Sequence, residues 1–355
     1  MSQISVLKKI LIVYSSRPPI IEYLENAFTR IGIESRRVFA DDNTWFDRLV
    51  IHRINKLVHS FRLLPKDREL FRHHPLSHLH FRSENLARSY TEFRPDLVLL
   101  IRGLNFRTDV LVNTRPLFGW WVEHEGRINE ALAEIRNFDA YFFMNESCVH
   151  AALDAGFAKA SYLAHAVDPD AFCPLPGLQK KYDICFVGNW SIKRQTYIEA
   201  ALKLTPNLAL YGGKWLRKCW NKPAILKCWK GGYVEGEKLN HLYNMSRVVL
   251  NITNWGQGHG KGRSGMNMRV LEVPATGTFL LTDESMEMDA FLTPGIHVGV
   301  YQDLGDFSIR LKHFLENAME RETIAAAGLA HVRKTHTYDH VAREIVERYM
   351  NWIKT

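Results

Sequence analysis

Apolar runs alternate with helical patterns through the first half of the chain. A run of apolar residues at 10–14 is followed by a turn, a helical pattern at 20–30 and a second strand at 35–39. Further apolar runs lie within residues 94–103, 116–126 and 139–144. Uninterrupted apolar runs are typical of strands buried on both faces of a parallel sheet, so the pattern predicts an α/β domain.

A second series of strands and helices begins after a stretch rich in proline and charge at residues 169–181. An apolar run at 182–187 leads into Gly188, and later apolar runs lie at residues 208–211, 248–252 and 278–282. Proline-rich and charged segments commonly separate domains. We therefore predict three parts: an amino-terminal domain over residues 1–174, a carboxyl-terminal domain over 175–338, and a last helix over 339–355 that crosses back to the first domain.

A glycine-rich segment stands in the middle of the second series. Residues 256–265 hold glycine at five of ten positions, and Lys261, Arg263, Ser264 and Gly265 lie within it. The backbone N–H groups of such a loop, together with the dipole of a following helix, suit an anion such as a diphosphate. A flexible, solvated loop before an ordinary helix would explain the same glycines equally well.

The predicted helix after this loop is opened by Ser264 or Gly265 and ends near Gly277. Arg269 and Glu272 are three residues apart on it and therefore share a face.

The residues that follow the strand at 182–187 form a second candidate contact for a phosphate. Gly188 allows close approach of the backbone, and Asn189 lies in the same turn. Arg194 lies in the first turn of the next predicted helix, where its side chain can reach a phosphate.

Charged residues also crowd at the end of a buried strand in the first half. Glu123, His124 and Glu125 follow an apolar run and precede Gly126. A charged side chain at such a position must be solvated, paired with an opposite charge, or engaged in binding or catalysis. The functional interpretation is a general base or a clamp for a substrate hydroxyl, and the structural interpretation is a solvated turn.

The composition is that of a globular protein with a large core. The 355 residues are 46% hydrophobic and carry a formal net charge of +8, which favours phosphate-bearing partners in general. No run of 18 apolar residues and no signal-peptide pattern is present, so we expect a cytoplasmic protein. The five cysteines lack the spacing of a zinc site, and the histidines at 73–80 fall in a proline-containing loop, so no metal site is predicted.

Two segments combine basic and apolar side chains. Residues 45–64 place apolar side chains at helical spacing with basic residues on other faces. This pattern fits a helix that touches a membrane surface or an anionic acceptor, but we favour a helix packed on the sheet with a solvated basic face. Residues 214–229 interleave tryptophans with basic residues, as single-stranded nucleic-acid binders do. The more ordinary interpretation is a segment that packs against its own domain and leaves its lysines in solvent.

Several motifs together resemble the CgeB-like glycosyltransferases, named for a spore maturation protein. They are the run at 268–283, Phe186-Val-Gly188, Leu250-Asn251, Thr335-His-Thr-Tyr-Asp-His340, Arg94-Pro-Asp-Leu-Val and His165-Ala-Val-Asp-Pro169. The resemblance implies a GT-B fold, in which two Rossmann-like domains face each other across a cleft. It also implies that the amino-terminal domain binds the acceptor, that the carboxyl-terminal domain binds a nucleotide-sugar donor, and that no metal or other cofactor is bound.

The resemblance also implies roles for individual residues. Glu272 corresponds to the glutamate that holds the ribose hydroxyls of the donor. Arg269 would lie on one side of the diphosphate, and Gly188 and Arg194 would lie on its other side. Many retaining GT-B enzymes carry two glutamates separated by seven residues, and Ser264 stands at the position of the first of them when Glu272 is the second. A retaining mechanism is therefore not implied.

We thus expect a bacterial glycosyltransferase that moves a sugar from a nucleoside diphosphate sugar to a hydroxyl. The acceptor would be a surface polysaccharide, a lipid-linked saccharide or a protein, with Glu123 or His124 deprotonating or orienting its hydroxyl. We expect a cytoplasmic location and no nucleic-acid partner, and we keep peripheral contact with the inner face of an anionic membrane as an alternative. The alternatives are an inactive GT-B binding or assembly protein and a basic binder of nucleic acid or anionic membrane. A dehydrogenase is disfavoured because no Gly-x-Gly-x-x-Gly follows the first strand.

Overall fold

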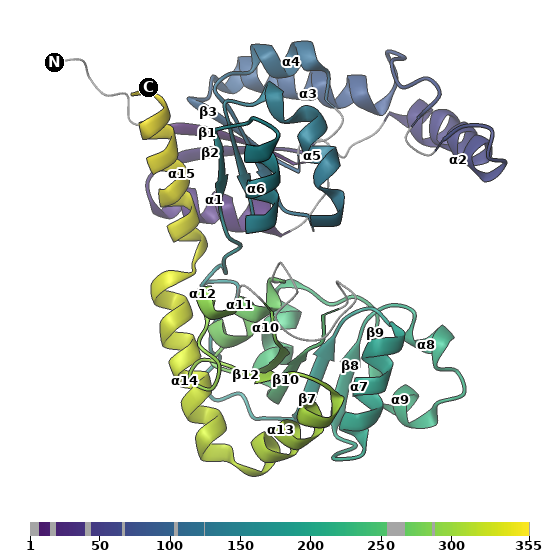
Figure 1. Cartoon of the computed structure of the whole chain (residues 1–355), viewed down its shortest axis with the longest axis vertical. Helices are drawn as coiled ribbons and strands as arrows, with labels where there is room; N and C mark the ends of the chain where they lie inside the picture. The colour runs from purple at the N-terminus through teal and green to yellow at the C-terminus, as the bar shows by residue number, and fades with distance from the viewer. Residues whose placement is uncertain are drawn as a thin grey trace. The chain divides into compact units, whose positions relative to one another are not determined.

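The structure is a computed structural model that describes residues 7–14, 19–39, 44–65, 68–102, 106–123, 125–253, 267–285 and 288–354. The chain forms two compact units, each built on its own sheet (Figure 1). Unit 1 comprises Met1–Ala164 and Ala342–Thr355, and unit 2 comprises His165–Val341. The prediction of two Rossmann-like α/β halves is confirmed.

Unit 1 is a six-stranded sheet in the order β2-β1-β3-β4-β5-β6, and every neighbouring pair is parallel. The strands are β1 (Lys9–Tyr14), β2 (Glu34–Phe39), β3 (Leu97–Ile101), β4 (Leu117–Trp121), β5 (Ala140–Phe143) and β6 (Ala160–Tyr162). Its main helices are α1 (Ile20–Arg30), α3 (His78–Phe93), α4 (Thr108–Asn113), α5 (Ile128–Glu134) and α6 (Glu146–Asp154). Every residue of β3 and β4 is buried, which explains why their sequences show no polar alternation.

Unit 2 repeats this plan with parallel strands in the order β12-β11-β10-β7-β8-β9. Its strands are β7 (Tyr182–Val187), β8 (Leu208–Tyr211), β9 (Trp229–Gly231), β10 (Ser246–Asn251), β11 (Phe279–Asp283) and β12 (Gly299–Tyr301). Its helices are α7 (Ile192–Leu202), α8 (Trp215–Lys218), α9 (Pro223–Cys228), α10 (Gly236–Asn244), α11 (Arg269–Ala275), α12 (Met288–Phe291), α13 (Leu304–Glu316) and α14 (Ala318–Thr335). The last helix, α15 (Tyr338–Trp352), begins in unit 2 and ends in unit 1, where Trp352 packs edge-on against Phe118.

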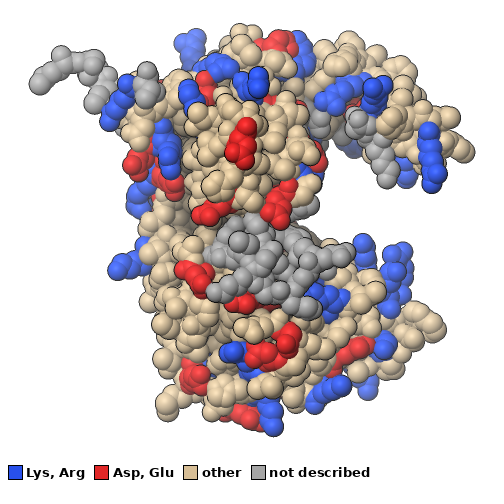
Figure 2. Space-filling model, in the orientation of Figure 1, with Lys and Arg blue, Asp and Glu red and all other residues tan. Residues whose placement is uncertain are grey.

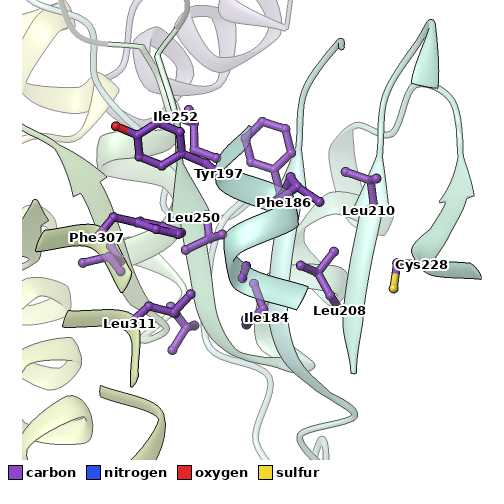
Figure 3. Packing of buried hydrophobic residues seen from close by; sticks show 14 of the residues in the cluster. Ile184, Phe186, Tyr197, Leu208, Leu210, Cys228, Leu250, Ile252, Phe307 and Leu311 are labelled. Atoms are coloured by element: carbon purple, nitrogen blue, oxygen red, sulfur yellow. The ribbon is translucent and has the colours of Figure 1, made fainter. Parts of the chain in front are cut away.

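One large apolar core holds unit 2 together. Side chains from three strands, among them Phe186, Leu210 and Leu250, meet Tyr197 of α7 and Phe307 of α13 (Figure 3). These side chains are almost completely buried, so truncating Leu250 to alanine would cost about 2–5 kcal/mol. This core fixes the carboxyl ends of β7 and β10, which position the site described below.

The proline-rich stretch predicted as a linker belongs to unit 2 instead. The backbone N–H groups of Cys173 and Leu175 donate to the side-chain oxygens of Asn240 and Asn244 on α10, at 3.2 and 2.9 Å. These hydrogen bonds hold the segment on unit 2, so the division falls at 164/165 rather than at 174/175.

The two basic and apolar segments differ in their environments. In the segment at 214–229, Trp215 is fully buried and donates its indole N–H to the Gly188 carbonyl at 2.7 Å, as expected for a segment that packs against its own domain. The segment at 45–64 forms a π-helical turn (Asp47–Ile51) and helix α2 (His52–Ser60). The prediction that this helix packs on the sheet is wrong, since Leu57 and Phe61 lie exposed to solvent.

Candidate functional site

The candidate site of unit 2 lies at the carboxyl ends of β7 and β10. In parallel sheets this edge gathers the loops that carry ligands. Gly188 follows β7 directly, and the hydroxyl of Ser191 caps α7 by accepting a hydrogen bond from the Arg194 N–H at 3.3 Å. The cap fixes Arg194 in the first turn of α7, while Arg269 begins α11.

Two arginines are held at this edge by backbone carbonyls and one asparagine. Arg269 donates to Asn251 Oδ1 at 2.9 Å and to the carbonyl of Val187. Arg194 donates from Nε to the Ile252 carbonyl at 2.9 Å and from Nη1 to the Asn189 carbonyl at 2.8 Å. Both guanidinium groups are therefore fixed by the ends of the strands rather than by carboxylates.

The two guanidinium groups also share one aromatic neighbour. The Arg194 and Arg269 guanidinium carbons lie 5.5 and 5.8 Å from the centre of the Phe186 ring. Burial and the nearby charge of Arg269 lower the pKa of Arg194 to about 10. Among the described residues, Arg269 Nε is buried and has no hydrogen-bond partner. The site thus concentrates positive charge that an anion would stabilise.

Glycine at position 188 is what allows Arg194 to approach the ring. A Cβ on Gly188 would lie 2.9 Å from Phe186 Cζ and 3.3 Å from Arg194 Cζ. Gly212, after β8, has φ of +137°, and a Cβ there would lie 2.0 Å from the Gly188 carbonyl oxygen. The side-chain oxygen of Asn189 accepts from the Gly213 N–H at 2.8 Å and so ties the two loops together.

Glu272 lies one helical turn after Arg269 on α11, and its side chain is buried. Burial raises the pKa of Glu272 to about 7, and the positive charge of Arg269 partly opposes this rise. The carboxyl group therefore changes its charge near neutral pH.

Three polar residues at the same edge were not among the predicted site residues, although Asn251 and Asp283 lie within the motifs quoted above. Asn251 is buried, donates to Thr282 Oγ1 at 2.9 Å and orients the Arg269 guanidinium. Lys193 donates to Asp283 Oδ2 and to the Thr253 carbonyl, both at 3.0 Å. A usable signal was present, because Asn251 and Asp283 are polar residues that end buried strands.

Unit 1 has its own charged cluster, around Glu123. Arg102 Nε lies 2.8 Å from Glu123 Oε1, and Arg127 Nη1 lies 3.3 Å from Oε2. Asn145 donates to the Glu123 backbone carbonyl at 3.4 Å. Glu123 is therefore an ion-paired carboxylate with both oxygens engaged, rather than a freely solvated turn residue.

The structure thus brings together five of the predicted site residues in unit 2: Gly188, Asn189, Arg194, Arg269 and Glu272. Glu123 lies in unit 1. The remaining predicted site residues, His124, Lys261, Arg263, Ser264 and Gly265, lie outside the described residues. Within the described ranges, no group of three or more His, Cys, Asp or Glu side chains is arranged to hold a metal ion.

Part of the chain matches one known protein family. Residues 193–347 match a family model described as glycosyl transferase-like. That range contains Arg194, Arg269 and Glu272. No curated protein matches the sequence.

Solved structures resemble the chain over nearly its whole length. Sucrose-phosphate synthase from Thermosynechococcus elongatus aligns with a TM-score of 0.68 and 12% identity, covering 98% of this chain and 99% of that one. Anabaena Alr3699/HepE in complex with UDP-glucose aligns with a TM-score of 0.63 and 13% identity, covering 96% and 98%. A glycosyltransferase from Rickettsia africae aligns with a TM-score of 0.66 and 10% identity, covering 98% and 99%. The chain therefore has the GT-B fold, and from residue 193 to 347 it carries the sequence pattern of glycosyl transferase-like proteins.

Proposed function

We propose that this chain is a glycosyltransferase that moves a sugar from a nucleoside diphosphate sugar to a hydroxyl acceptor. The observation that carries this proposal is the pair of guanidinium groups of Arg194 and Arg269, packed against one ring at the carboxyl ends of β7 and β10. The family match over residues 193–347 and the GT-B fold support the same assignment. Because HepE was crystallised with UDP-glucose, that sugar nucleotide is the first donor to test.

The two arginines would bind the diphosphate of the donor. Guanidinium groups donate charge-assisted hydrogen bonds to phosphate oxygens. In the transfer step the acceptor oxygen bonds to the anomeric carbon while the bond from that carbon to the diphosphate breaks, so negative charge develops on the leaving diphosphate. Arg194 and Arg269 are placed to stabilise this charge, as fixed cations do in other sites. We therefore propose that the reaction needs no metal ion.

Glu272 would accept hydrogen bonds from the two ribose hydroxyls of the donor. A carboxylate does this best when it is ionised, and its pKa of about 7 places that change close to neutral pH. We further propose that the glycine-rich loop, through Lys261, Arg263, Ser264 and Gly265, adds N–H groups and charge to the diphosphate site.

The acceptor hydroxyl would be handled by unit 1. Because both Glu123 oxygens are engaged by Arg102 and Arg127, we assign Glu123 an orienting role and leave proton abstraction to His124 or to the departing diphosphate. The proposed acceptors are a bacterial surface polysaccharide, a lipid-linked saccharide or a protein. Within the glycosyltransferases we place the chain with the CgeB-like group on the motifs given above, and we propose that it acts in the cytoplasm.

A turnover assay tests the proposal directly. Purified protein is incubated with UDP-glucose and other sugar nucleotides, with and without an extract containing native acceptors, and release of nucleoside diphosphate is measured. We expect release from at least one donor, and we expect Arg269→Ala to abolish it. Absence of release from every donor with extract present would contradict the proposal.

Serine at position 264 motivates one alternative, a GT-B protein that binds a sugar nucleotide without transferring the sugar. The two candidates agree on binding and differ in turnover. Nucleotide binding in calorimetry without release in the assay would favour the alternative.

A further inference from the structure

The outer side of residues 45–63 is exposed to solvent and is not packed against another part of the chain that the structure describes. Five large apolar side chains on it are between 49% and 74% exposed: Trp45, Leu49, Leu57, Phe61 and Leu63. We call this face the α2 surface, and it includes the π-helical turn Asp47–Ile51 and α2. So dense a group of exposed apolar side chains is uncommon on a protein without a partner.

The inner side of the same segment is already packed. Ile51 and Asn55 are buried, and Asn55 exchanges two hydrogen bonds with the backbone of Leu70, at 3.1 and 2.7 Å. Asp47 is buried and accepts from the His78 N–H at 3.1 Å. The helix is therefore anchored through its polar inner face, and its apolar outer face is not required for the fold.

The α2 surface is also strongly basic. Arg48, Arg53, Lys56 and Arg62 are all exposed on it. Asp47 is the single acidic residue between positions 45 and 63, and it is buried on the inner side. Figure 2 shows Lys and Arg atoms among uncharged atoms over the region that carries α2 in Figure 1. The exposed charge of this surface is thus about four positive and none negative.

We propose that the α2 surface binds the surface of an anionic lipid bilayer. Basic side chains would pair with anionic headgroups while the leucine and aromatic side chains enter the boundary between headgroups and acyl chains. No helix among the described residues has the length and apolar character to cross a bilayer, so the contact would be peripheral. This inference goes beyond the proposed function and holds whichever sugar is transferred.

Two other partners fit the surface less well. A second copy of the chain would bring four cations against four cations, which repel. Single-stranded nucleic acid is bound by stacking bases on aromatic rings, and although Trp45 and Phe61 offer such rings, the other three exposed apolar side chains are leucines. Aliphatic side chains beside cations are the combination that a bilayer surface accommodates.

Co-sedimentation of the full-length protein with vesicles tests the proposal. Vesicles of phosphatidylcholine mixed with phosphatidylglycerol are compared with vesicles of phosphatidylcholine alone. We expect binding to the mixed vesicles that is lost with pure phosphatidylcholine and weakens with added salt. Two variants, Leu57→Ser with Phe61→Ser and Arg53→Glu with Lys56→Glu, should each weaken binding by roughly tenfold or more. Because all four side chains are exposed, both variants should keep the wild-type circular dichroism spectrum and melting temperature.

Matched controls carry the same chemical changes elsewhere in the chain. Ile309→Ser removes an exposed apolar side chain from α13, and Lys312→Glu with Lys334→Glu reverses two exposed lysines of unit 2. Both controls should bind vesicles as the wild type does. The proposal would be overturned if the α2 variants bound vesicles as the wild type does, or if the controls lost binding equally. It would also be overturned if the wild type did not bind vesicles and instead formed a dimer that the α2 variants disrupt. Competition in which single-stranded oligonucleotide binds more tightly than the mixed vesicles would overturn it as well.

Discussion

Arg194 and Arg269 place their guanidinium carbons 5.5 and 5.8 Å from the centre of the same ring, that of Phe186. They come from helices more than seventy residues apart in the sequence, α7 and α11, and both are fixed by carbonyl groups at the ends of strands. Two partly buried like charges destabilise each other unless an anion lies near them. The glycosyltransferase proposal explains this arrangement, because a diphosphate would lie against both.

Gly188→Ala should disturb the packing of Arg194 against the Phe186 ring. The new Cβ would lie 2.9 Å from Phe186 Cζ and 3.3 Å from Arg194 Cζ, so one of these side chains must move. We expect a loss of about 1–3 kcal/mol in the free energy of unfolding, together with weaker nucleotide binding. Urea denaturation and calorimetry measure the two effects.

Gly232→Ala is the matched control, since no atom lies within 4 Å of the Cβ that it would add. It should leave both stability and nucleotide affinity near wild type. Equal stability and equal nucleotide affinity of the two glycine variants would show that the close contacts at Gly188 affect neither property.

The raised pKa of Glu272 should make the protein less stable as the pH rises towards neutral. Its pKa is raised from 4.5 to about 7, so between these values the folded state binds more protons than the unfolded state. The stabilising contribution is fully present below pH 4.5 and is lost as the pH rises through about 7, by up to ~3 kcal/mol. Glu272→Gln, which stays neutral, should therefore gain stability relative to wild type at pH 8 and not at pH 4.5. Denaturant unfolding across this range would contradict the account if the two proteins changed in parallel.

The same carboxyl group should control nucleotide affinity with the opposite sign. Ribose hydroxyls donate best to an ionised carboxylate, so donor binding should strengthen as the pH rises through about 7. Glu272→Gln should bind more weakly and lose this pH dependence. Calorimetry at pH 6 and pH 8 makes the comparison, and an unchanged pH dependence in the variant would exclude Glu272 as the ribose contact.

His336 should limit stability in acid. Burial lowers its pKa from 6.5 to about 4, and its Nε2 lies 3.1 Å from the Phe291 carbonyl. Between these pH values the unfolded state binds the additional proton, so stability falls as the pH falls from 6.5 to about 4, and solvent screening of this partly exposed ring makes the loss smaller than the full shift in pKa implies. His336→Gln should flatten this acid limb, whereas His73→Gln, at an exposed position, should not. Identical acid limbs in all three proteins would show that His336 does not titrate as described.

Glu123→Gln separates orientation of the acceptor from proton transfer at the charged cluster of unit 1. The amide keeps the shape of the carboxylate but weakens its contacts with Arg102 and Arg127. If Glu123 orients the acceptor, KM for the acceptor should rise several-fold with a smaller change in kcat. A fall in kcat of about a hundredfold or more at unchanged KM, which is the size typical of a lost catalytic base, would instead identify Glu123 as the base.

The fold was predictable because buried parallel strands carry a distinctive sequence. Leu97–Ile101 is apolar at every position, and in unit 2 the strand Leu208–Tyr211 and the last four residues of Tyr182–Val187 are apolar too. Arg194 was also predictable, since a strand, a glycine and a helix start place it at the carboxyl edge of the sheet. The pairing of Lys193 with Asp283 was not, because ninety residues separate them and only the sheet order brings them together.

The environment of α2 could not be predicted from its pattern. Apolar residues at helical spacing with basic residues on other faces describe a helix on a core and a helix on a membrane equally well. What decides is that Asn55, a polar residue, forms the inner contact and Phe61 points outward. Likewise, the charged turn at Glu123 predicted a catalytic or substrate-binding role. The ion pairs with Arg102 and Arg127 could not be predicted, because they depend on how the strand ends and the following helix are placed in the fold.

Calorimetric titration of UDP, GDP, CDP and TDP into the wild-type protein and Arg269→Ala tests the central claim most directly. Arg310→Ala, which removes an arginine paired with Asp306 on α13, is the control. We predict that the wild type and the control bind at least one nucleoside diphosphate alike. Arg269→Ala, still folded by circular dichroism, should bind it roughly 10- to 100-fold more weakly, as expected for a lost hydrogen bond to a charged group. Equal affinity of folded Arg269→Ala and wild type for every nucleoside diphosphate would contradict the claim that this arginine binds the diphosphate.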